Sequence, residues 1–196
     1  MLKIGLTGGI ASGKTYISNL FSQLQVPVID TDIISRNALE PGLTAYQEVV
    51  SHFGQSILLA DGQIDRRRLR RLIFDNSAEK SWLESILHPI VFELTQRQIA
   101  QHYPASYVII VVPLLFETNF RDLVDRVLVV DCPAKVQTQR LLERDKIDPE
   151  LAQKMLSQQW SNQRRLAQAD DIIDNSANLA LDEQVSALHR KYSHIT

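Results

Sequence analysis

The sequence predicts an α/β fold of three layers, in which helices cover both faces of a five-stranded parallel sheet. Five short segments are apolar and rich in β-branched residues rather than alternating, as expected for strands buried on both faces. These segments are Lys3–Leu6, Val28–Asp30, Tyr107–Val112, Arg126–Val130 and Ile172–Asp174. Helical patterns separate them, which favours right-handed crossovers. No repeat or linker divides the 196 residues, so we expect one folding unit.

The first strand runs into a glycine-rich loop. Gly8–Thr15 reads Gly-Gly-Ile-Ala-Ser-Gly-Lys-Thr and has the spacing of a phosphate-binding P-loop, and Tyr16–Phe21 after it has helical spacing. In such a loop, backbone N–H groups turn toward phosphate oxygens and the helix N-terminus adds partial positive charge. Lys14 is expected to reach the β- and γ-phosphates, and the Thr15 hydroxyl to ligate Mg²⁺. The sequence therefore predicts a nucleoside triphosphate site rather than a simple turn before a helix.

Two acidic residues follow the second strand. Asp30-Thr31-Asp32 stands at the carboxyl edge, where α/β sheets bind ligands. If the chain stays extended there, Asp30 and Asp32 point to the same side. One carboxylate can then accept the proton of an attacking hydroxyl or hold Mg²⁺ through water, whereas the alternative is a turn or a helix cap. We expect Asp32 to be the base and Asp30 to orient it or to help with the metal.

Residues 42–102 are longer than one crossover helix requires, and they predict a helical substrate-binding insertion. They include the basic run Arg66–Arg71, which indicates either the solvated side of a helix or a site for an anionic substrate tail. His88-Pro89 is interpreted as the start of a helix.

Residues 134–169 predict a helical lid. Asp148-Pro149-Glu150 is typical of a helix start, with an N-cap, a proline and an acid in the first turn. Arg140 and Arg144 are four residues apart and so share one helix face. That face can close over a triphosphate and exclude water, or it can be a solvated basic face that pairs with nearby acids.

The remaining strand ends favour a small-molecule kinase over other P-loop proteins. The third strand runs into Pro113–Glu117 instead of a Walker-B aspartate, and Asp131 after the fourth strand is interpreted as structural. The Asn-Lys-x-Asp and Asp-x-x-Gly patterns of GTPases are absent from the sequence. A motor ATPase or a signalling GTPase is therefore disfavoured.

Composition restricts the partners and the compartment. A formal charge of −2 and a pI near 6.2 argue against a nucleic-acid partner. The single Cys132 cannot form an internal disulfide, which fits a reducing cytosol. The longest apolar stretch, Val108–Phe116, is too short to span a bilayer. We expect a cytoplasmic protein with no targeting segment, no membrane contact and no obligate protein partner.

Several motifs, taken in order, resemble the dephospho-coenzyme A kinase family from the first strand to the last helix. They are Gly8–Thr15, Asp30–Asp32, His88-Pro89, Val112–Glu117 and Ala169–Asn175. The phosphate loop is shared by many families, whereas Pro-Leu-Leu-Phe-Glu is the most discriminating piece. The resemblance implies the P-loop kinase fold with a core, a substrate domain and a lid. It also implies ATP-dependent phosphorylation of the ribose 3′-hydroxyl of dephospho-coenzyme A with Mg²⁺.

The resemblance further implies roles for individual residues. The ATP-binding set is Gly8, Gly9, Ala11, Ser12, Gly13, Lys14, Thr15, Tyr16, Arg140, Arg144, Gln159 and Arg165. The acceptor set is Asp32, His88, Leu114, Leu115, Phe116 and Glu117. Within these sets Lys14, Asp32 and Arg140 are expected to be catalytic, and Thr15 and Asp32 to bind the metal. Thr31 departs from the family, which commonly has alanine between the two acids.

Two other functions remain open at this point. Another nucleotide or small-molecule kinase with the same core would differ in its acceptor, since a nucleoside monophosphate kinase prefers a nucleotide phosphate to a ribose hydroxyl. A nucleotide-sensing regulatory protein would bind ATP without acceptor-dependent turnover. The acids after the second strand and the arginines of the lid favour the enzyme.

Overall fold

The computed structural model describes residues 1–74, 76–177 and 180–195. The chain forms two compact units. The first combines Met1–Asp30 with Gln98–Thr196, and the second is Thr31–Arg97. Each unit has a hydrophobic core of its own.

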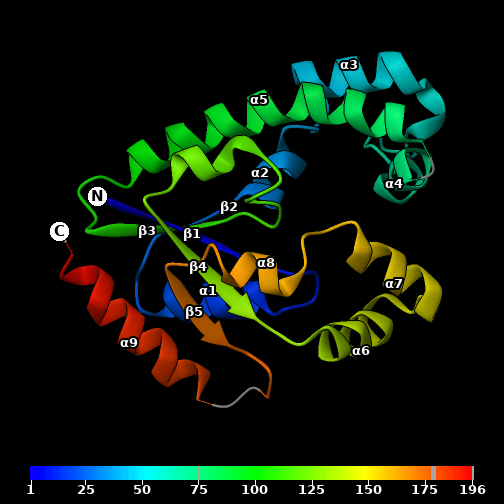
Figure 1. Cartoon of the computed structure of the whole chain (residues 1–196). Helices are drawn as coiled ribbons and strands as arrows, with labels where there is room; N and C mark the ends of the chain where they lie inside the picture. Colours follow the sequence, from blue (N-terminus) through cyan, green and yellow to red (C-terminus); the bar gives the residue numbers. More distant parts are fainter. Residues whose placement is uncertain (75, 178–179, 196) are drawn as a thin grey trace. The chain divides into compact units, whose positions relative to one another are not determined.

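A parallel sheet of five strands, in the order β2-β3-β1-β4-β5, forms the centre of the first unit (Figure 1). The strands are β1 (Leu2–Gly8), β2 (Val28–Asp30), β3 (Tyr107–Val111), β4 (Arg126–Asp131) and β5 (Asp171–Asp174). The predicted α/β class and five-stranded parallel sheet are confirmed. The predicted bounds of β2 are exact, and the ends of the other strands differ from prediction by at most two residues. β1, for example, continues to Gly8 because Gly8 still pairs with Val130 of β4.

The helices of the first unit lie between and after the strands. They are α1 (Lys14–Gln23), the 3₁₀ helix η2 (Asn119–Leu123), α6 (Ala134–Asp145), α7 (Pro149–Ser157), α8 (Asn162–Leu166) and α9 (Leu181–Ser193). α1 and α9 contact each other and pack on one face of the sheet, and α8 packs against β4. α6 and α7 pack together as a pair between β4 and α8 in the chain (Figure 1).

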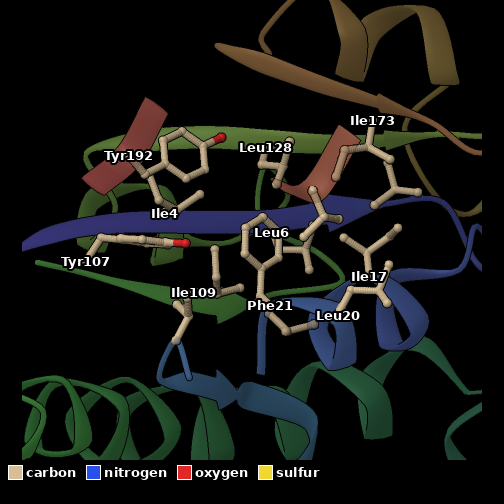
Figure 2. Packing of buried hydrophobic residues seen from close by; sticks show 14 of the residues in the cluster. Ile4, Leu6, Ile17, Leu20, Phe21, Tyr107, Ile109, Leu128, Ile173 and Tyr192 are labelled. Carbon is tan, nitrogen blue, oxygen red and sulfur yellow. The ribbon is translucent and has the colours of Figure 1, made fainter. Parts of the chain in front are cut away.

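The core of the first unit joins α1 and α9 to the strands. Figure 2 shows Ile17 and Phe21 of α1 and Tyr192 of α9 among the apolar side chains of the strands, such as Leu6 and Leu128. All five side chains are fully buried. Burial of side chains of this size contributes roughly 1.5–3 kcal/mol each, so this layer holds β1, and the loop after it, firmly in place.

The opposite face of β1 is covered by the segment after β3. A Cβ atom at Gly5 would lie 3.0 Å from Val124 Cγ1 and 3.1 Å from Leu115 Cδ2, so this segment packs directly on the β1 backbone. One strand departs from the expectation of two buried faces. β5 lies at the edge of the sheet and alternates, and Ile172 is 50% exposed.

The second unit is built from helices. They are α2 (Thr31–Asn37), α3 (Thr44–Phe53), the 3₁₀ helix η1 (Gln55–Ile57), α4 (Arg66–Phe74) and most of α5 (Ser77–Gln101). Their apolar faces meet in a separate core that includes Leu39, Val49, Ile57, Leu69 and Leu83. The unit therefore has its own means of holding α2, the helix that carries Asp32.

The prediction that a helix starts at His88-Pro89 is wrong. α5 begins at Ser77, because the Asn76 side chain accepts hydrogen bonds from the backbone N–H groups of Ala78 (3.0 Å) and Glu79 (3.3 Å). Pro89 lies inside the helix, where a proline costs about 3 kcal/mol. A buried stripe on both sides of it offsets that cost; the stripe is Leu83, Leu87, Val91 and Thr95.

Candidate functional site

The glycine loop between β1 and α1 has a tightly determined shape. Gly13 caps α1 with a left-handed φ of 100°, and a Cβ atom there would collide with the side-chain nitrogen of Asn175. A Cβ atom at Gly9 would lie 2.7 Å from Arg165 Nη2 and would collide with the Gln137 side chain. Glycine is thus required at both positions, for backbone conformation at Gly13 and for space at both.

Lys14 folds back over this loop. Its Nζ donates hydrogen bonds to the carbonyl oxygens of Gly8 (2.9 Å) and Gly9 (3.0 Å). The ammonium group is therefore held at the loop that the sequence predicts to bind phosphates. Thr15 and Tyr16 are exposed in the first turn of α1, so both side chains are accessible from solvent.

Ser12 is a buried polar residue of the loop. Its hydroxyl is fully buried and has no hydrogen-bond partner within the described ranges. Its carbonyl oxygen accepts a 2.8 Å hydrogen bond from Asn175 Nδ2, and Arg140 Nη1 lies 3.5 Å away. These two side chains, from positions far along the chain, meet the loop at the same carbonyl.

Arg140 and Asn175 border a cavity of about 390 Å³ beside the loop. Its lining consists of Ala11, Gly13, Tyr16, Arg140, Asn175 and Leu181. Arg140 Nη2 lies 3.5 Å from both the carbonyl and the side-chain oxygen of Asn175. A cavity with polar groups at the loop and an apolar wall is suited to the non-phosphate part of a nucleotide.

Arg144 is arranged differently from Arg140. Its Nε and Nη2 donate to the Asp145 carboxylate at 2.7 and 2.9 Å. The hydrogen bonds that Arg144 donates to Asp145 raise the pKa of its guanidinium. The structure thus gives Arg144 the exposed ion pair that the sequence left open as an alternative, and it does not bring Arg144 to the loop cavity.

The segment between α7 and α8 is attached to the loop. Gln159 Oε1 accepts a 2.9 Å hydrogen bond from the backbone N–H of Ile10. The backbone N–H of the neighbouring Trp160 donates to the Glu117 carboxylate at 3.1 Å, and the Trp160 carbonyl oxygen accepts from Arg165 Nη1 at 2.5 Å. These bonds bring Gln159, Arg165 and Glu117 of the predicted sets to the base of the lid segment.

Arg165 carries a buried positive charge beside the segment between α7 and α8. It is 4% exposed, and its Nε has no hydrogen-bond partner among the described residues. Burial lowers the pKa of the Arg165 guanidinium, and the Glu117 carboxylate partly opposes that change. An arginine nevertheless stays protonated in proteins, so the loop has a fixed positive charge behind Gly9.

Two residues of the site were missed in the sequence as functional candidates. Asn175 is 2% exposed and follows the last strand directly, and Gln137 is 1% exposed and donates a 2.5 Å hydrogen bond to the Cys132 carbonyl. Asn175 had one sequence signal, a polar residue at the carboxyl edge of the sheet. Gln137 had none, because a single glutamine in a helix is usually solvated.

The predicted acceptor residues after β3 differ in how exposed their side chains are. Leu114, Phe116 and Glu117 are accessible to different degrees, and Phe116 stacks on Trp160 with ring centroids 5.1 Å apart. Leu115 is fully buried and packs over Gly5. An acceptor cannot reach the Leu115 side chain, so that part of the expectation is corrected: Leu115 belongs to the core.

The expectation that Asp30 and Asp32 share one side of an extended chain is also wrong. β2 ends at Asp30 and α2 begins at Thr31, so the chain turns into a helix between the two acids. Thr31 is buried, and Asp32 is exposed in the first turn of α2, where a negative charge is favourable. Asp32 and His88 both belong to the second unit, and His88 is half-buried within α5.

Two features are absent from the described residues. No described helix combines the length and the apolar character needed to cross a membrane. Groups of three or more His, Cys, Asp and Glu side chains with the geometry of a metal site do not occur in the described ranges either.

Comparison with known proteins covers nearly the whole chain. A family model described as dephospho-CoA kinase matches residues 2–181. The dephospho-CoA kinase of Yersinia pseudotuberculosis is 45% identical over 190 residues, which cover 96% of this chain and 92% of the relative. That of Vibrio vulnificus (strain CMCP6) is 45% identical over 193 residues, 97% of this chain and 95% of the relative. The solved structure of the dephospho-CoA kinase from Campylobacter jejuni matches with a TM-score of 0.73 and 26% identity, covering 97% and 96% of the two chains.

Proposed function

This chain belongs to the dephospho-CoA kinase family, and we propose that it transfers the γ-phosphoryl group of ATP to the ribose 3′-hydroxyl of dephospho-coenzyme A. This reaction is the final step of coenzyme A synthesis. The observation that carries the proposal is the joining of Lys14, Arg140 and Asn175 at one glycine loop, in a chain that matches the family over almost its full length.

ATP is proposed to bind at the loop and the cavity beside it. The triphosphate would lie on the backbone N–H groups of the loop, with Lys14 at the β- and γ-phosphates. The cavity of about 390 Å³ would take the adenosine part, between Tyr16 of α1, Arg140 of α6 and Asn175 after β5. The buried, unpartnered Ser12 hydroxyl supports a polar ligand at the loop, because a buried hydroxyl without a partner is costly.

Mg²⁺ is proposed to be held by Thr15 and Asp32. A hydroxyl and a carboxylate are hard oxygen donors that suit Mg²⁺, and in kinases this ion takes only one or two protein ligands beside phosphates and water. The exposed Thr15 side chain in the first turn of α1 fits that role. When bound, the ion neutralises charge on the phosphates during transfer.

Asp32 is proposed to be the general base. Its carboxylate would take the proton of the ribose hydroxyl while that oxygen attacks the γ-phosphorus in line, with no covalent enzyme intermediate. Such a base is typically worth ~10²–10⁴-fold in rate. Exposure of Asp32 at the start of α2 supports access to an acceptor. Positioning and charge stabilisation would account for the rest of the acceleration.

The helical parts are proposed to divide the remaining tasks. Residues 134–169 would act as the lid, with Arg140 stabilising charge on the transferred group and α6 and α7 excluding water. Residues 42–102 would hold the acceptor, which is supported by the compact helical unit Thr31–Arg97 with its own core. The cytoplasmic location and the absence of nucleic-acid and protein partners stay predictions.

The experiment that tests the function is ADP release from Mg·ATP with no acceptor, dephospho-coenzyme A, AMP or adenosine. We expect strong stimulation by dephospho-coenzyme A, with a single phosphate added to it by mass spectrometry. Stimulation by AMP instead would keep a kinase and overturn the acceptor. Tight ATP binding without stimulation by any acceptor would favour the regulatory alternative.

A further inference from the structure

A basic residue, Arg36, stands one helical turn after Asp32 in α2. Arg36 lies four positions further along α2, so both side chains project from one face with Cβ atoms about 5–6 Å apart. Both residues are exposed. No ion pair involves the Arg36 guanidinium in the part of the chain that the structure describes, so its charge is available to a ligand.

α4 brings another arginine to the same place. Arg66 Nη2 donates a 3.0 Å hydrogen bond to the carbonyl oxygen of Arg36. The start of α4 is fixed by Asp65, whose carboxylate accepts from the N–H groups of Arg67 and Arg68, both at 3.0 Å. Because a guanidinium has five N–H donors, Arg66 retains others for an anion next to Arg36.

A cavity of about 310 Å³ continues from Arg66 within the second unit. Its lining consists of Leu39, Glu40, Pro41, Gln63, Ile64 and Arg66. Leu39, Pro41 and Ile64 offer apolar contacts, while the side chains of Glu40 and Gln63 offer hydrogen bonds. This mixture suits a chain of methylene and amide groups better than a purely apolar or purely ionic ligand.

We propose that Arg36 and Arg66 bind the pyrophosphate of dephospho-coenzyme A and that the cavity beside them takes its pantetheine arm. The assignment rests on the proposed function, because it starts from the ribose 3′-hydroxyl at Asp32. In the acceptor, one ribose ring separates that hydroxyl from the 5′-pyrophosphate, and the arm follows the pyrophosphate. The protein presents a matching order: the Asp32 carboxylate, then Arg36 one turn further along α2 with Arg66 of α4 bonded to its carbonyl, and then the cavity that Arg66 lines.

Charge supports this match. The arginines of α4 are all exposed, and ion pairs with acidic side chains are absent for them in the described ranges. Arginine recognises phosphate oxygens through two parallel hydrogen bonds, so a pair of arginines is suited to a pyrophosphate. Among the α4 arginines, Arg66 lines the cavity and also hydrogen-bonds to α2.

The test uses charge-removing variants with a control on the same helix. Arg36→Gln and Arg66→Gln should each raise the KM for dephospho-coenzyme A about tenfold or more, since charge-assisted hydrogen bonds to phosphate are lost. The KM for ATP should stay within about twofold of the wild type. Arg68→Gln removes an equal charge about 160° around α4 from Arg66 and should change neither KM. Arg66→Lys, which keeps the charge, should recover part of the loss.

The arm is tested separately by filling the cavity. Gln63 is exposed, so Gln63→Trp should narrow the cavity, raise the KM for dephospho-coenzyme A and leave the KM for ATP unchanged. Gln47→Trp, at an exposed position of α3, is the control for an added indole. An unchanged KM for dephospho-coenzyme A in Gln63→Trp would overturn the assignment of the arm.

Calorimetric titration with dephospho-coenzyme A in the absence of ATP separates this inference from the proposed function. If the wild type phosphorylates dephospho-coenzyme A but both glutamine variants bind it as tightly as the wild type, only the arginine site is overturned. If the wild type binds it without phosphorylating it and the variants bind more weakly, the function fails and the site stands. Equal weakening toward ATP and dephospho-coenzyme A would indicate general damage and overturn the site.

Discussion

Asn175 Nδ2 donates a 2.8 Å hydrogen bond to the carbonyl oxygen of Ser12, a residue 163 positions earlier in the chain. The bond joins the residue that follows β5 to the centre of the glycine loop. Both residues are almost completely buried, so the bond is shielded from water. The shape of the loop therefore depends on the last strand of the sheet as well as on its own glycines.

Replacement of Asn175 tests this dependence. Asn175→Ala leaves the Ser12 carbonyl without its donor, and we expect a loss of about 1–3 kcal/mol in the free energy of unfolding. We also expect ATP to bind more weakly, because the loop and one wall of the cavity lose their support. Urea unfolding and calorimetric ATP titration measure the two effects. Asn19→Ala, at an exposed position of α1, is the control, and equal effects in both variants would contradict the prediction.

Gly13 and Gly42 both have positive φ, and alanine variants at the two positions distinguish the cost of backbone strain from the cost of a steric clash. Gly13 has φ 100° and no room for a Cβ atom beside Asn175, whereas Gly42 has φ 93° and nothing within 4 Å. Alanine at either position should cost about 1–2 kcal/mol of stability for the left-handed conformation. Only Gly13→Ala should also abolish ATP binding, which calorimetry would detect. If Gly13→Ala bound ATP as Gly42→Ala does, the tight loop would not be needed for the nucleotide.

The proposed base predicts a loss of turnover without a loss of nucleotide binding. Asp32→Asn keeps the shape of the side chain but cannot accept the hydroxyl proton, so kcat should fall by ~10²–10⁴-fold. The dissociation constant for ATP should change little. Steady-state kinetics and calorimetry measure the two quantities, with Glu48→Gln at an exposed position of α3 as the control. Equal loss of kcat and ATP affinity would make Asp32 a binding residue or a folding residue.

Two buried tyrosines predict a loss of stability at alkaline pH. Burial raises the pKa of Tyr107 and of Tyr192 above the ordinary value of 10.0, and for Tyr192 the Asp171 carboxylate adds to the increase. Below pH 10 both states keep the protons, so stability is unaffected there. Above pH 10 only the unfolded chain releases them, and the free energy of unfolding should fall by about 1.4 kcal/mol per pH unit for each tyrosine.

Urea unfolding between pH 9 and 11.5 measures that slope. Tyr192→Phe should reduce this slope above pH 10 by the contribution of one tyrosine. The variant also loses the 3.0 Å bond from Tyr192 to Asp171, but that lowers stability at all pH values and does not change the slope. Tyr103→Phe, at a residue that is 77% exposed, is the matched control. An unchanged slope in Tyr192→Phe would mean that this hydroxyl releases its proton equally in both states.

The sequence predicted the features that local patterns determine. The spacing of Gly8–Thr15 predicted the loop, and runs such as Arg126–Val130 predicted the strands, because buried parallel strands leave a continuous apolar signal. The fold class follows from the alternation of these runs with helices.

What the sequence did not predict depends on contacts between distant segments. A polar residue such as Asn175 has its role only because the end of β5 lies beside the loop, and Gln137 only because the start of α6 lies against Gly9. The interpretation of Pro89 as a helix start gave too much weight to a local preference that buried packing on both sides overcame. The turn between Asp30 and Asp32 was similarly decided by where α2 begins.

The attachments of the lid segment have a consequence for how the chain can vary. Gln137 packs against Gly9, and Gln159 bonds the N–H of Ile10, so the chain departs from and returns to two adjacent residues of the loop. α6 and α7 therefore form an excursion whose two ends are both attached to the loop, at Gly9 and at Ile10. Residues added to or removed from the middle of this excursion would not pull on β4 or β5. The length of this part can therefore differ while the attachments that fix the phosphate loop stay the same.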